Sequence, residues 1–340
     1  MKITGTFLDE ITVDIPSNNW GPAEWEKDFA AMKRMGIDTV IIIRSGWGRN
    51  AVFDSRVLKK KLQILPVYSD LAAMFLELAE KYKMKLFFGT YDSNTFWRDG
   101  RLQEELDINL SLVDEIWQKY GKCKAFAGWY MSHEFGRRYG GLPEGERLTG
   151  DCKAQGGDLP QYQKKLADHC KSVSGGLPVI MSPYMWGKKI VGDSAINIEQ
   201  HRKEWDEIFS ILHKSVDIVA FQDGHVDYNE LKDYICVNKE LINKYQMTAW
   251  SNVESFDRDM PFSFPPIDWR KMQWKLDFAA QAGVDKCITF EFSHFMSPYS
   301  MWPSAHNLYK RYCEHFRIDI SDLYSKPLEN RHDVVSLIEV

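Results

Sequence analysis

AFAGWYMSHE at residues 125–134 and MTAWSNVES at residues 247–255 each combine an apolar run with a glutamate near the end of the run. Short apolar runs of this kind are typical of buried strands, and each is followed here by a stretch with helical spacing. Strands that alternate with helices predict parallel β-α-β units. Eight such runs occur, at 2–10, 38–48, 85–92, 125–134, 178–185, 217–225, 247–255 and 286–294.

Eight strand-helix units are the number that closes a (β/α)8 barrel, the TIM barrel, whose active sites lie at the carboxyl ends of the strands. The first helical stretch shows the design, because Trp25, Phe29 and Met32 share one face and Gly36 ends the pattern. That face is expected to pack on the outside of the barrel. Helices are predicted at 22–36, 70–84, 102–121, 159–173, 198–215, 228–246, 268–283 and 304–316.

The domain organisation follows from these units. Residues 1–316 are predicted to form one barrel domain, since barrels of this type often exceed 250 residues. A loop rich in glycine and charge at 135–158 follows the fourth strand, where a long loop favours a lid or a subsite wall. Residues 317–340 are expected to form a tail packed on the barrel.

Composition excludes several classes of partner. The net charge is −5 and no basic stripe is present, so nucleic acid is not an expected partner. No apolar run reaches the roughly 18 residues of a membrane span, so no membrane partner is expected. The six cysteines lack CxxC spacing and indicate neither a zinc ribbon nor a disulfide framework. As given, the chain is expected to be cytoplasmic; a periplasmic or secreted location stays open if a leader was removed.

Polar side chains end every predicted strand. Because the carboxyl ends of parallel barrel strands meet at one rim, these side chains are expected to surround the barrel mouth. They are Asp9, Glu10, Arg44, Asp92, His133, Glu134, Tyr184, Asp223, His225, Asn252, Glu254, Glu291 and His294.

Two of these side chains favour a specific chemistry. Glu134 and Glu254 end the fourth and seventh strands, which are near enough across a barrel mouth to direct two carboxylates at one bond. Glycoside hydrolysis needs such a pair, because one carboxyl protonates the leaving oxygen while the other attacks or activates water. One acidic residue after a strand is as often a helix cap or an ion-pair partner, whereas two favour catalysis.

Aromatic side chains near the strand ends support a carbohydrate substrate. Indole faces pack against the C–H faces of sugar rings, although some tryptophans simply fill the core. Four follow predicted strand ends, namely Trp47, Trp97, Trp186 and Trp302, while Trp129 and Trp250 lie within strands.

Four strings, TGTFLDE (4–10), WYMSHE (129–134), FQDG (221–224) and WSNVESF (250–256), resemble the bacterial family labelled domain of unknown function 4434. This resemblance covers roughly residues 2 to 316 and implies a glycoside-hydrolase-like barrel. More distantly, the placement of the two glutamates is similar to clan A glycoside hydrolases, which implies Glu134 as acid/base and Glu254 as nucleophile. The sequence departs from the clan at His133, where an asparagine usually precedes the acid/base.

The sequence therefore predicts a glycoside hydrolase acting on an oligo- or polysaccharide, without a cofactor or metal and with its oligomeric state left open. Asp223 and Glu291 are expected to orient or tune the two glutamates. The remaining expected substrate-binding side chains are Asp9, Trp47, Trp97, Tyr184, Trp186, His225, Asn252, His294 and Trp302.

Two alternatives use the same mouth. An acid and histidine set could hold a divalent metal in a sugar isomerase or epimerase, although no His-x-His spacing supports it. That set is Glu134, Asp223, His225, Glu254 and Glu291. A carbohydrate-binding barrel without catalysis would keep the tryptophans and need neither glutamate.

Overall fold

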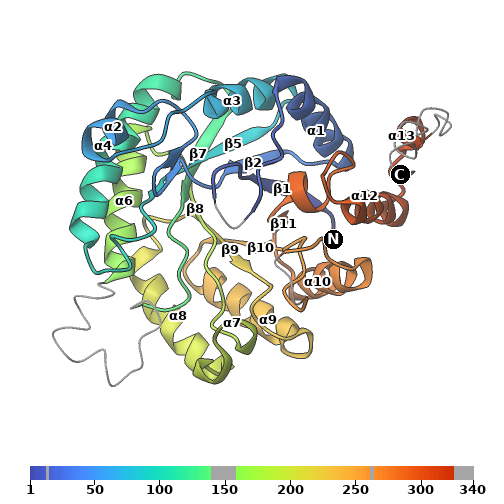
Figure 1. The fold of residues 1–340 in the computed structure, drawn as a ribbon. Helices are drawn as coiled ribbons and strands as arrows, with labels where there is room; N and C mark the ends of the chain where they lie inside the picture. The colour runs from blue at the N-terminus through green and yellow to red at the C-terminus, as the bar shows by residue number, and fades with distance from the viewer. Residues whose placement is uncertain (13–14, 139–157, 261–263, 325–340) are drawn as a thin grey trace, which may run out of the picture.

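The computed structural model describes residues 1–12, 15–138, 158–260 and 264–324. Eight parallel strands close into a barrel in the order β1-β2-β5-β7-β8-β9-β10-β11, and β1 is hydrogen-bonded to both β2 and β11. Figure 1 looks into this barrel and shows the helices arranged around the strands. The predicted (β/α)8 barrel is confirmed.

All eight predicted strand-helix units are present. The barrel strands are β1 (Ile3–Leu8), β2 (Thr39–Ile42), β5 (Lys85–Gly89), β7 (Phe126–Met131), β8 (Val179–Met181), β9 (Ile218–Gln222), β10 (Thr248–Asn252) and β11 (Lys286–Thr289). The surrounding helices are α1 (Pro22–Met35), α3 (Leu71–Lys81), α4 (Leu102–Tyr120), α6 (Leu159–Val173), α8 (Ile198–Leu212), α9 (Tyr228–Lys244), α10 (Trp269–Ala282) and α12 (Pro303–Phe316).

Side chains alternate between the two faces of each strand, as the period of a strand requires. In β2, Ile41 belongs to the cluster inside the barrel, whereas Val40 and Ile42 belong to the cluster between barrel and helices. Phe7 and Phe87 join Ile41 in the interior. The barrel centre is therefore a packed core, and open space is left to the rim.

The helices begin where the sequence provides caps. The side chains of Asp70, Asp158, Asn197 and Asp268 each accept a hydrogen bond from a backbone N–H in the first turn of α3, α6, α8 and α10. Caps of this kind stabilise a helix by about 1 kcal/mol each. Because these helices follow the barrel strands, their capped ends lie on the rim that carries the strand carboxyl ends.

Short elements decorate that rim. After β2 the chain forms a hairpin of β3 (Gly46–Trp47) and β4 (Asn50–Ala51), and β6 (Tyr91–Asp92) pairs with β3 beside it. The short helices are α2 (Arg56–Lys61), α7 (Lys188–Val191), the 3-10 helix η2 (Gly192–Ser194), α11 (Phe292–Phe295) and α13 (Ser321–Tyr324). The sequence pattern predicted none of the short helices, since elements this short have no readable period. It included β3 and β6 in the strands predicted at 38–48 and 85–92, and the strand predicted at 286–294 ends at Thr289, where the chain goes on into α11.

Two predicted features lie largely outside the described residues. The loop expected at 135–158 is described only at its two ends, and the tail expected at 317–340 only as far as residue 324. Within that part, Arg34 on α1 forms a bidentate ion pair with Asp322, at 2.7 and 2.8 Å, and Leu323 packs against the core.

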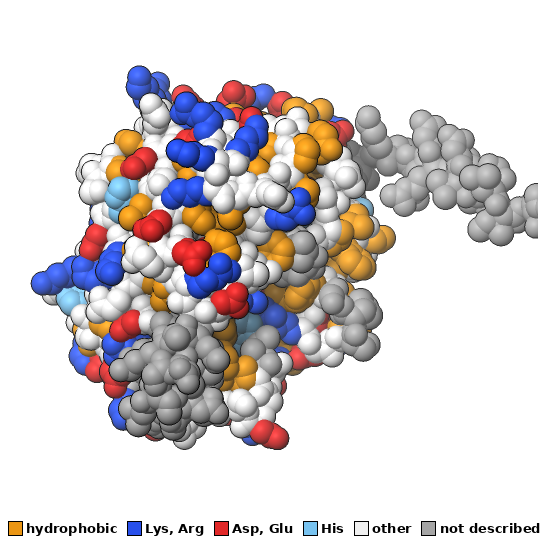
Figure 2. All heavy atoms as spheres, turned by 60° about the vertical axis from the view of Figure 1, so that its left-hand side comes forward, with side chains coloured by type: hydrophobic (Ala, Val, Ile, Leu, Met, Phe, Trp, Pro, Cys, Tyr) orange, Lys and Arg blue, Asp and Glu red, His pale blue; other side chains and the backbone are white. Residues whose placement is uncertain are grey.

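Among the described residues, no helix is long and apolar enough to cross a membrane. On the face of the molecule shown in Figure 2, basic and acidic side chains are interspersed and no large patch of one sign is seen.

Candidate active site

A cavity of about 100 Å³ lies at the barrel mouth and collects side chains from six of the eight strand ends and the loops that follow them. It brings Glu134 and Glu254 into one space, together with the predicted sugar-contact residues Asp9 and Asn252. The complete lining is Asp9, Ile15, Ile43, Arg44, Glu134, Gln222, Asn252, Glu254, Phe256, Arg258, Phe264 and Phe290.

Glu134 follows β7 and retains 21% exposure of its side chain, toward the cavity. The buried hydroxyl of Tyr130 donates a hydrogen bond to its Oε1 at 2.7 Å, and Gln222 also hydrogen-bonds to it. Burial raises the pKa of Glu134 above its usual value, although Arg44, Tyr130 and Gln222 oppose the increase. A carboxyl group of this kind keeps its proton to higher pH, as a general acid must.

Glu254 follows β10 and is only 1% exposed, but its neighbours shift its pKa in the opposite direction to that of Glu134. Arg258 holds it in a bidentate ion pair, with Nε to Oε2 and Nη2 to Oε1 both at 2.8 Å. Burial alone would raise the pKa of Glu254, but Arg258, His225 and Lys275 outweigh burial and lower the pKa to about 2. Glu254 is therefore a carboxylate at every pH near neutrality.

The FQDG string, one of those that mark the resemblance, has a distinct role at each polar position. Gln222 lines the cavity, and Asp223 Oδ1 accepts the backbone N–H of Glu254 at 3.0 Å. Gly224 leaves room for the carboxylate, since a Cβ there would lie 1.7 Å from Glu254 Oε2. Asp223 and Gly224 of this string therefore hold the backbone of Glu254 and leave space for its carboxylate.

A buried lysine also holds Asp223 and the backbone of Glu254 in place. Lys275 on α10 is 2% exposed and donates from Nζ to Asp223 Oδ1 at 2.7 Å and to the carbonyl of Glu254 at 3.0 Å. Asp223 itself is held at a pKa of about 6, raised by burial and by Glu254 against the effect of Lys275. The expectation that Asp223 orients Glu254 fits this geometry, whereas Lys275 was not among the expected residues.

A second set of contacts supports Arg44, which stands between two carboxylates. Its Nε lies 3.5 Å from Asp92 Oδ2 and its Nη2 lies 3.8 Å from Glu134 Oε2. Asp92 is fixed on its other oxygen by the indole N–H of Trp97, at 2.8 Å. Burial would raise the pKa of Asp92, but His133 and Arg44 lower it, so Asp92 stays ionised and balances the charge of Arg44.

His133 does not face the cavity. It is 1% exposed, and its Nε2 is hydrogen-bonded to Glu105 Oε1 at 2.8 Å beneath the rim. Asp92, Glu105 and His133 are the one group of described His, Cys, Asp and Glu residues spaced as metal ligands could be. The hydrogen bond within the group and the guanidinium of Arg44 beside Asp92 make it an ion-pair network, since a cation there would be repelled by Arg44.

Glu291 and His294 form another buried group near the first strand. Glu291 is 0% exposed, caps α11, and accepts hydrogen bonds from the backbone and from Nδ1 of His294. Burial would lower the pKa of His294, but the adjacent Glu291 and Glu10 raise it to about 9. Neither Glu291 nor His294 lines the cavity, so both are one layer removed from it.

Two cavity side chains retain hydrogen-bonding capacity. Asn252 donates to Ser182 Oγ at 3.2 Å, and its Oδ1 has no partner in the described part of the chain. Asp9 uses Oδ1 to accept the amides of Ile11 and Thr12, and its Oδ2 is likewise without a described partner. Buried acceptors of this kind are suited to the hydroxyl groups of a sugar.

The expected aromatic residues lie around the cavity without lining it. Tyr184 and Trp186 stack on each other with ring centroids 5.7 Å apart, and His225 packs edge-on to Tyr184 at 4.9 Å. Trp97 is 8% exposed and supports Asp92. Neither Trp47, in β3, nor Trp302, at the start of α12, is part of the lining, which comes instead from Phe256, Phe264 and Phe290.

Sequence reasoning missed several functional side chains. Arg258 lies four residues after Glu254, and only the i, i+4 spacing of opposite charges could have indicated it. Lys275 lies within the predicted helix 268–283 and Gln222 within the predicted strand 217–225, and neither position indicated a role at the cavity. The metal set of the isomerase alternative is not free to bind a cation, since Arg258 and Lys275 already hold Glu254 and Asp223.

Comparison with known proteins identifies the family. Residues 3–302 match the family model described as "Domain of unknown function (DUF4434)". The chain belongs to the DUF4434 family. This DUF4434 chain is 48% identical to a solved Bacteroides thetaiotaomicron protein described as a "putative alpha-L-fucosidase", with a TM-score of 0.86 and coverage of 94% of each chain.

Other similar structures share the barrel fold with this DUF4434 protein. A β-galactosidase from the haloarchaeon Halorubrum lacusprofundi has a TM-score of 0.57 at 13% identity, covering 93% of this chain and 58% of the other. An endo-1,4-β-D-mannanase from Thermotoga petrophila has a TM-score of 0.52 at 13% identity, covering 85% and 88%. A search of curated proteins found no match.

Proposed function

We propose that this protein is a glycoside hydrolase that uses Glu134 as general acid/base and Glu254 as nucleophile or second base. The observation that carries the proposal is the pair of glutamates in one cavity with opposite environments, one with a raised pKa and one held at about 2. Hydrolysis of a glycosidic bond needs one carboxyl group that holds a proton more readily beside one that stays ionised, and these opposite pKa shifts favour that division of roles. The Bacteroides relative, described as a "putative alpha-L-fucosidase", also supports it.

The surroundings of the pair suit a neutral sugar. The two cations of the cavity, Arg44 and Arg258, are already balanced by Asp92 and Glu254, so neither is left over for an anionic substrate. The free acceptors of Asp9 and Asn252 can bind hydroxyl groups, while Phe256 and Phe290 offer apolar surface to a ring. The proposed substrate is an oligo- or polysaccharide of uncharged sugars.

Retention of configuration is the proposed stereochemical outcome. It rests on the placement of the glutamates after the fourth and seventh barrel strands and on the permanently ionised state of Glu254, which suits a nucleophile. Because Arg258 occupies both oxygens of Glu254, one of these hydrogen bonds has to lengthen as the carboxylate reaches the anomeric carbon. Inversion would assign Glu254 the role of base toward water.

The test is a hydrolysis screen with wild-type protein. Aryl α- and β-glycosides of fucose, galactose, glucose, mannose and xylose, together with plant and host oligosaccharides, are incubated and released sugar is measured. Proton NMR of the first-formed anomer then assigns retention or inversion. Activity on at least one glycoside that is lost in both Glu134→Gln and Glu254→Gln is the expected result, and a folded wild-type protein inactive on the whole panel contradicts the proposal.

A further inference from the structure

A second hollow lies on the same rim of the barrel, outside the cavity that holds the two glutamates. This groove, of about 410 Å³, is formed by the loop after β1, the β3–β4 hairpin and the segment that leads into α3. The two hollows are lined by consecutive residues of the loop after β1, since Asp9 lines the cavity and Glu10 lines the groove. Its lining residues are Glu10, Ile11, Ser17, Trp20, Asn50, Ala51, Leu65, Pro66, Val67, Tyr68, Ser69 and Leu71.

Tyr68 is the most unusual side chain of the groove, because it is 97% exposed. A large aromatic ring that buries almost no surface contributes little to folding, so the whole ring is available to a ligand in the groove. Trp20 adds a second ring, which is half-buried and held edge-on by the fully buried Trp25 at 5.1 Å. Rings of this kind offer flat apolar faces to the C–H surface of a sugar.

The wall that carries Tyr68 is fixed at both ends. On one side, the amide of Leu65 donates to the carbonyl of Arg49 and the Arg49 side chain donates to the carbonyl of Gln63, both at 2.8 Å. On the other side, Asp70 caps α3 and accepts the hydroxyl of Tyr120 at 2.7 Å. The exposed ring is thus presented from an anchored segment, which lowers the entropic cost of binding.

Polar groups complete the groove. Glu10 accepts the hydroxyl of Ser17 at 2.6 Å and lies 3.7 Å from His294 Nε2, so its carboxylate is held in place. Asn50 donates to the carbonyl of Ile11 at 3.0 Å, which ties the hairpin to the loop after β1. A groove with aromatic faces, a fixed carboxylate and amide and hydroxyl groups suits a ligand that has both apolar faces and hydroxyl groups, as a sugar does.

We propose that this groove is a second carbohydrate subsite, which binds the part of an oligosaccharide on the non-leaving side of the cleaved bond. The assignment of the side rests on the proposed function, because the acid Glu134 has to face the leaving group. Tyr184 and Trp186 stack on each other after β8, and Gly136, two residues after Glu134, packs directly on the Tyr184 ring. The groove lies by β1 and β2, away from β7 in the barrel order, and so receives the other end of the chain.

The experiment compares substrates that differ only on the non-leaving side. In 4-nitrophenyl glycosides of one and three sugars, in the xylo, gluco, manno and galacto series, the nitrophenyl group is always the leaving group. Tyr68→Ala should lower kcat/KM for the trisaccharide about 5- to 10-fold through KM, and leave the monosaccharide glycoside within twofold. Because Tyr68 is 97% exposed, the melting temperature should not change.

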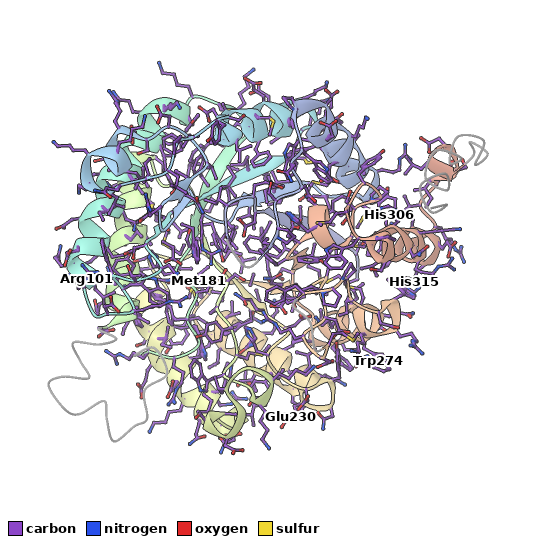
Figure 3. The ribbon with its side chains drawn as sticks, viewed as in Figure 1. Arg101, Met181, Glu230, Trp274, His306 and His315 are labelled. Carbon is purple, nitrogen blue, oxygen red and sulfur yellow. The ribbon has the colours of Figure 1, made fainter. Side chains whose placement is uncertain are left out.

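Trp274→Ala is the matched control. Trp274 is also an exposed aromatic residue, at 50%, but it lies on the outer helix α10 far from the barrel centre (Figure 3). An equal response of the two variants on the trisaccharide overturns the subsite. So does a wild-type enzyme that cleaves the one-sugar and three-sugar glycosides equally well.

A binding assay separates this inference from the proposed function. Electrophoresis in native gels containing xylan, mixed-linkage β-glucan, galactomannan or galactan measures retardation of wild type, Tyr68→Ala and Trp274→Ala without any need for hydrolysis. Retardation that is lost only in Tyr68→Ala supports the groove, even if the wild type cleaves none of the glycosides and the hydrolase proposal fails. Hydrolysis without any dependence on Tyr68 leaves the hydrolase proposal intact and removes the groove.

Discussion

Glu134 and Glu254 share one cavity, but the two sides of the barrel mouth treat the same side chain in opposite ways. On the β7 side, Glu134 meets a tyrosine hydroxyl and an arginine no closer than 3.8 Å, and burial raises its pKa. On the β10 side, Arg258 forms a bidentate ion pair with Glu254, and Lys275 donates a hydrogen bond to the carbonyl of Glu254. The comparison shows how the neighbours of one residue type shift its pKa in opposite directions.

The largest expected effect comes from removing either carboxylate. Glu134→Gln and Glu254→Gln keep the size of the side chain and one acceptor oxygen, so the fold should persist while kcat falls by at least about 10³-fold. Steady-state kinetics on the best glycoside of the screen measures this, with circular dichroism as the check on folding. Turnover within a few-fold of wild type in either variant would remove that residue from the mechanism.

Lys275→Met tests the contacts that hold Asp223 and the backbone of Glu254. It leaves the carboxylate of Asp223 buried without its cation, so we expect a loss of about 3 kcal/mol in the free energy of unfolding and a lower kcat, because Glu254 loses its anchor. Denaturant titration measures the first quantity. The double variant Lys275→Met/Asp223→Asn should recover part of the stability, and a single variant as stable as wild type contradicts the role of the ion pair.

Arg258→Met tests what keeps Glu254 ionised. Without the guanidinium, the pKa of Glu254 should rise from about 2 by about one to three units. Since the carboxylate form is required, activity is lost below this pKa, and the acid limb of the kcat/KM profile should move to higher pH. Arg270→Met, an exposed pair with Asp268, is the control. An acid limb that stays in place would separate Arg258 from the charge of Glu254.

Arg44→Met tests the other side of the comparison. Arg44 lowers the pKa of Glu134, so its removal should raise that pKa further, by on the order of one unit. The protonated form of Glu134 is the required one and is lost as pH rises through the pKa, so the alkaline limb should move to higher pH. A shift of this limb to lower pH would reverse the assignment of the two glutamates.

The smallest expected effect is at the aromatic pair beside Glu134. Trp186→Ala should raise KM about three- to fivefold for substrates with a sugar leaving group and change kcat by less than twofold. Aryl glycosides, whose leaving group differs, serve as the comparison. An unchanged KM with a lowered melting temperature would indicate that Trp186 is a packing residue, consistent with its indole N–H bond to the carbonyl of Ser194 at 3.0 Å.

The barrel was predictable from sequence because each strand carries a run of apolar residues that only a doubly covered parallel sheet can bury. The two glutamates were predictable for a related reason, since the residue that follows such a strand must lie at the rim. Their partners were not. Arg258 and Lys275 belong to a loop and a helix, and nothing in their spacing tells which charges turn inward.

The aromatic residues show the same limit. Proximity to a strand end fixes the height of a side chain on the barrel but not its direction around the rim. The buried indole N–H of Trp97 donates to Asp92, whereas the aromatic residues that line the cavity are Phe256, Phe264 and Phe290. Tyr68 lies in a segment with no strand or helix period and could be found only from its exposure.

The reach of Lys275 from an outer helix to the mouth matters for protein engineering. Loops at the rim of a barrel are natural units for grafting onto another scaffold, and the loop after β10 would carry Glu254 and Arg258 with it. The anchor of that loop, however, is supplied by α10 and by Asp223 after β9. The smallest transplantable module that preserves the geometry of Glu254 is therefore the continuous segment from β9 through α10, residues 218–282.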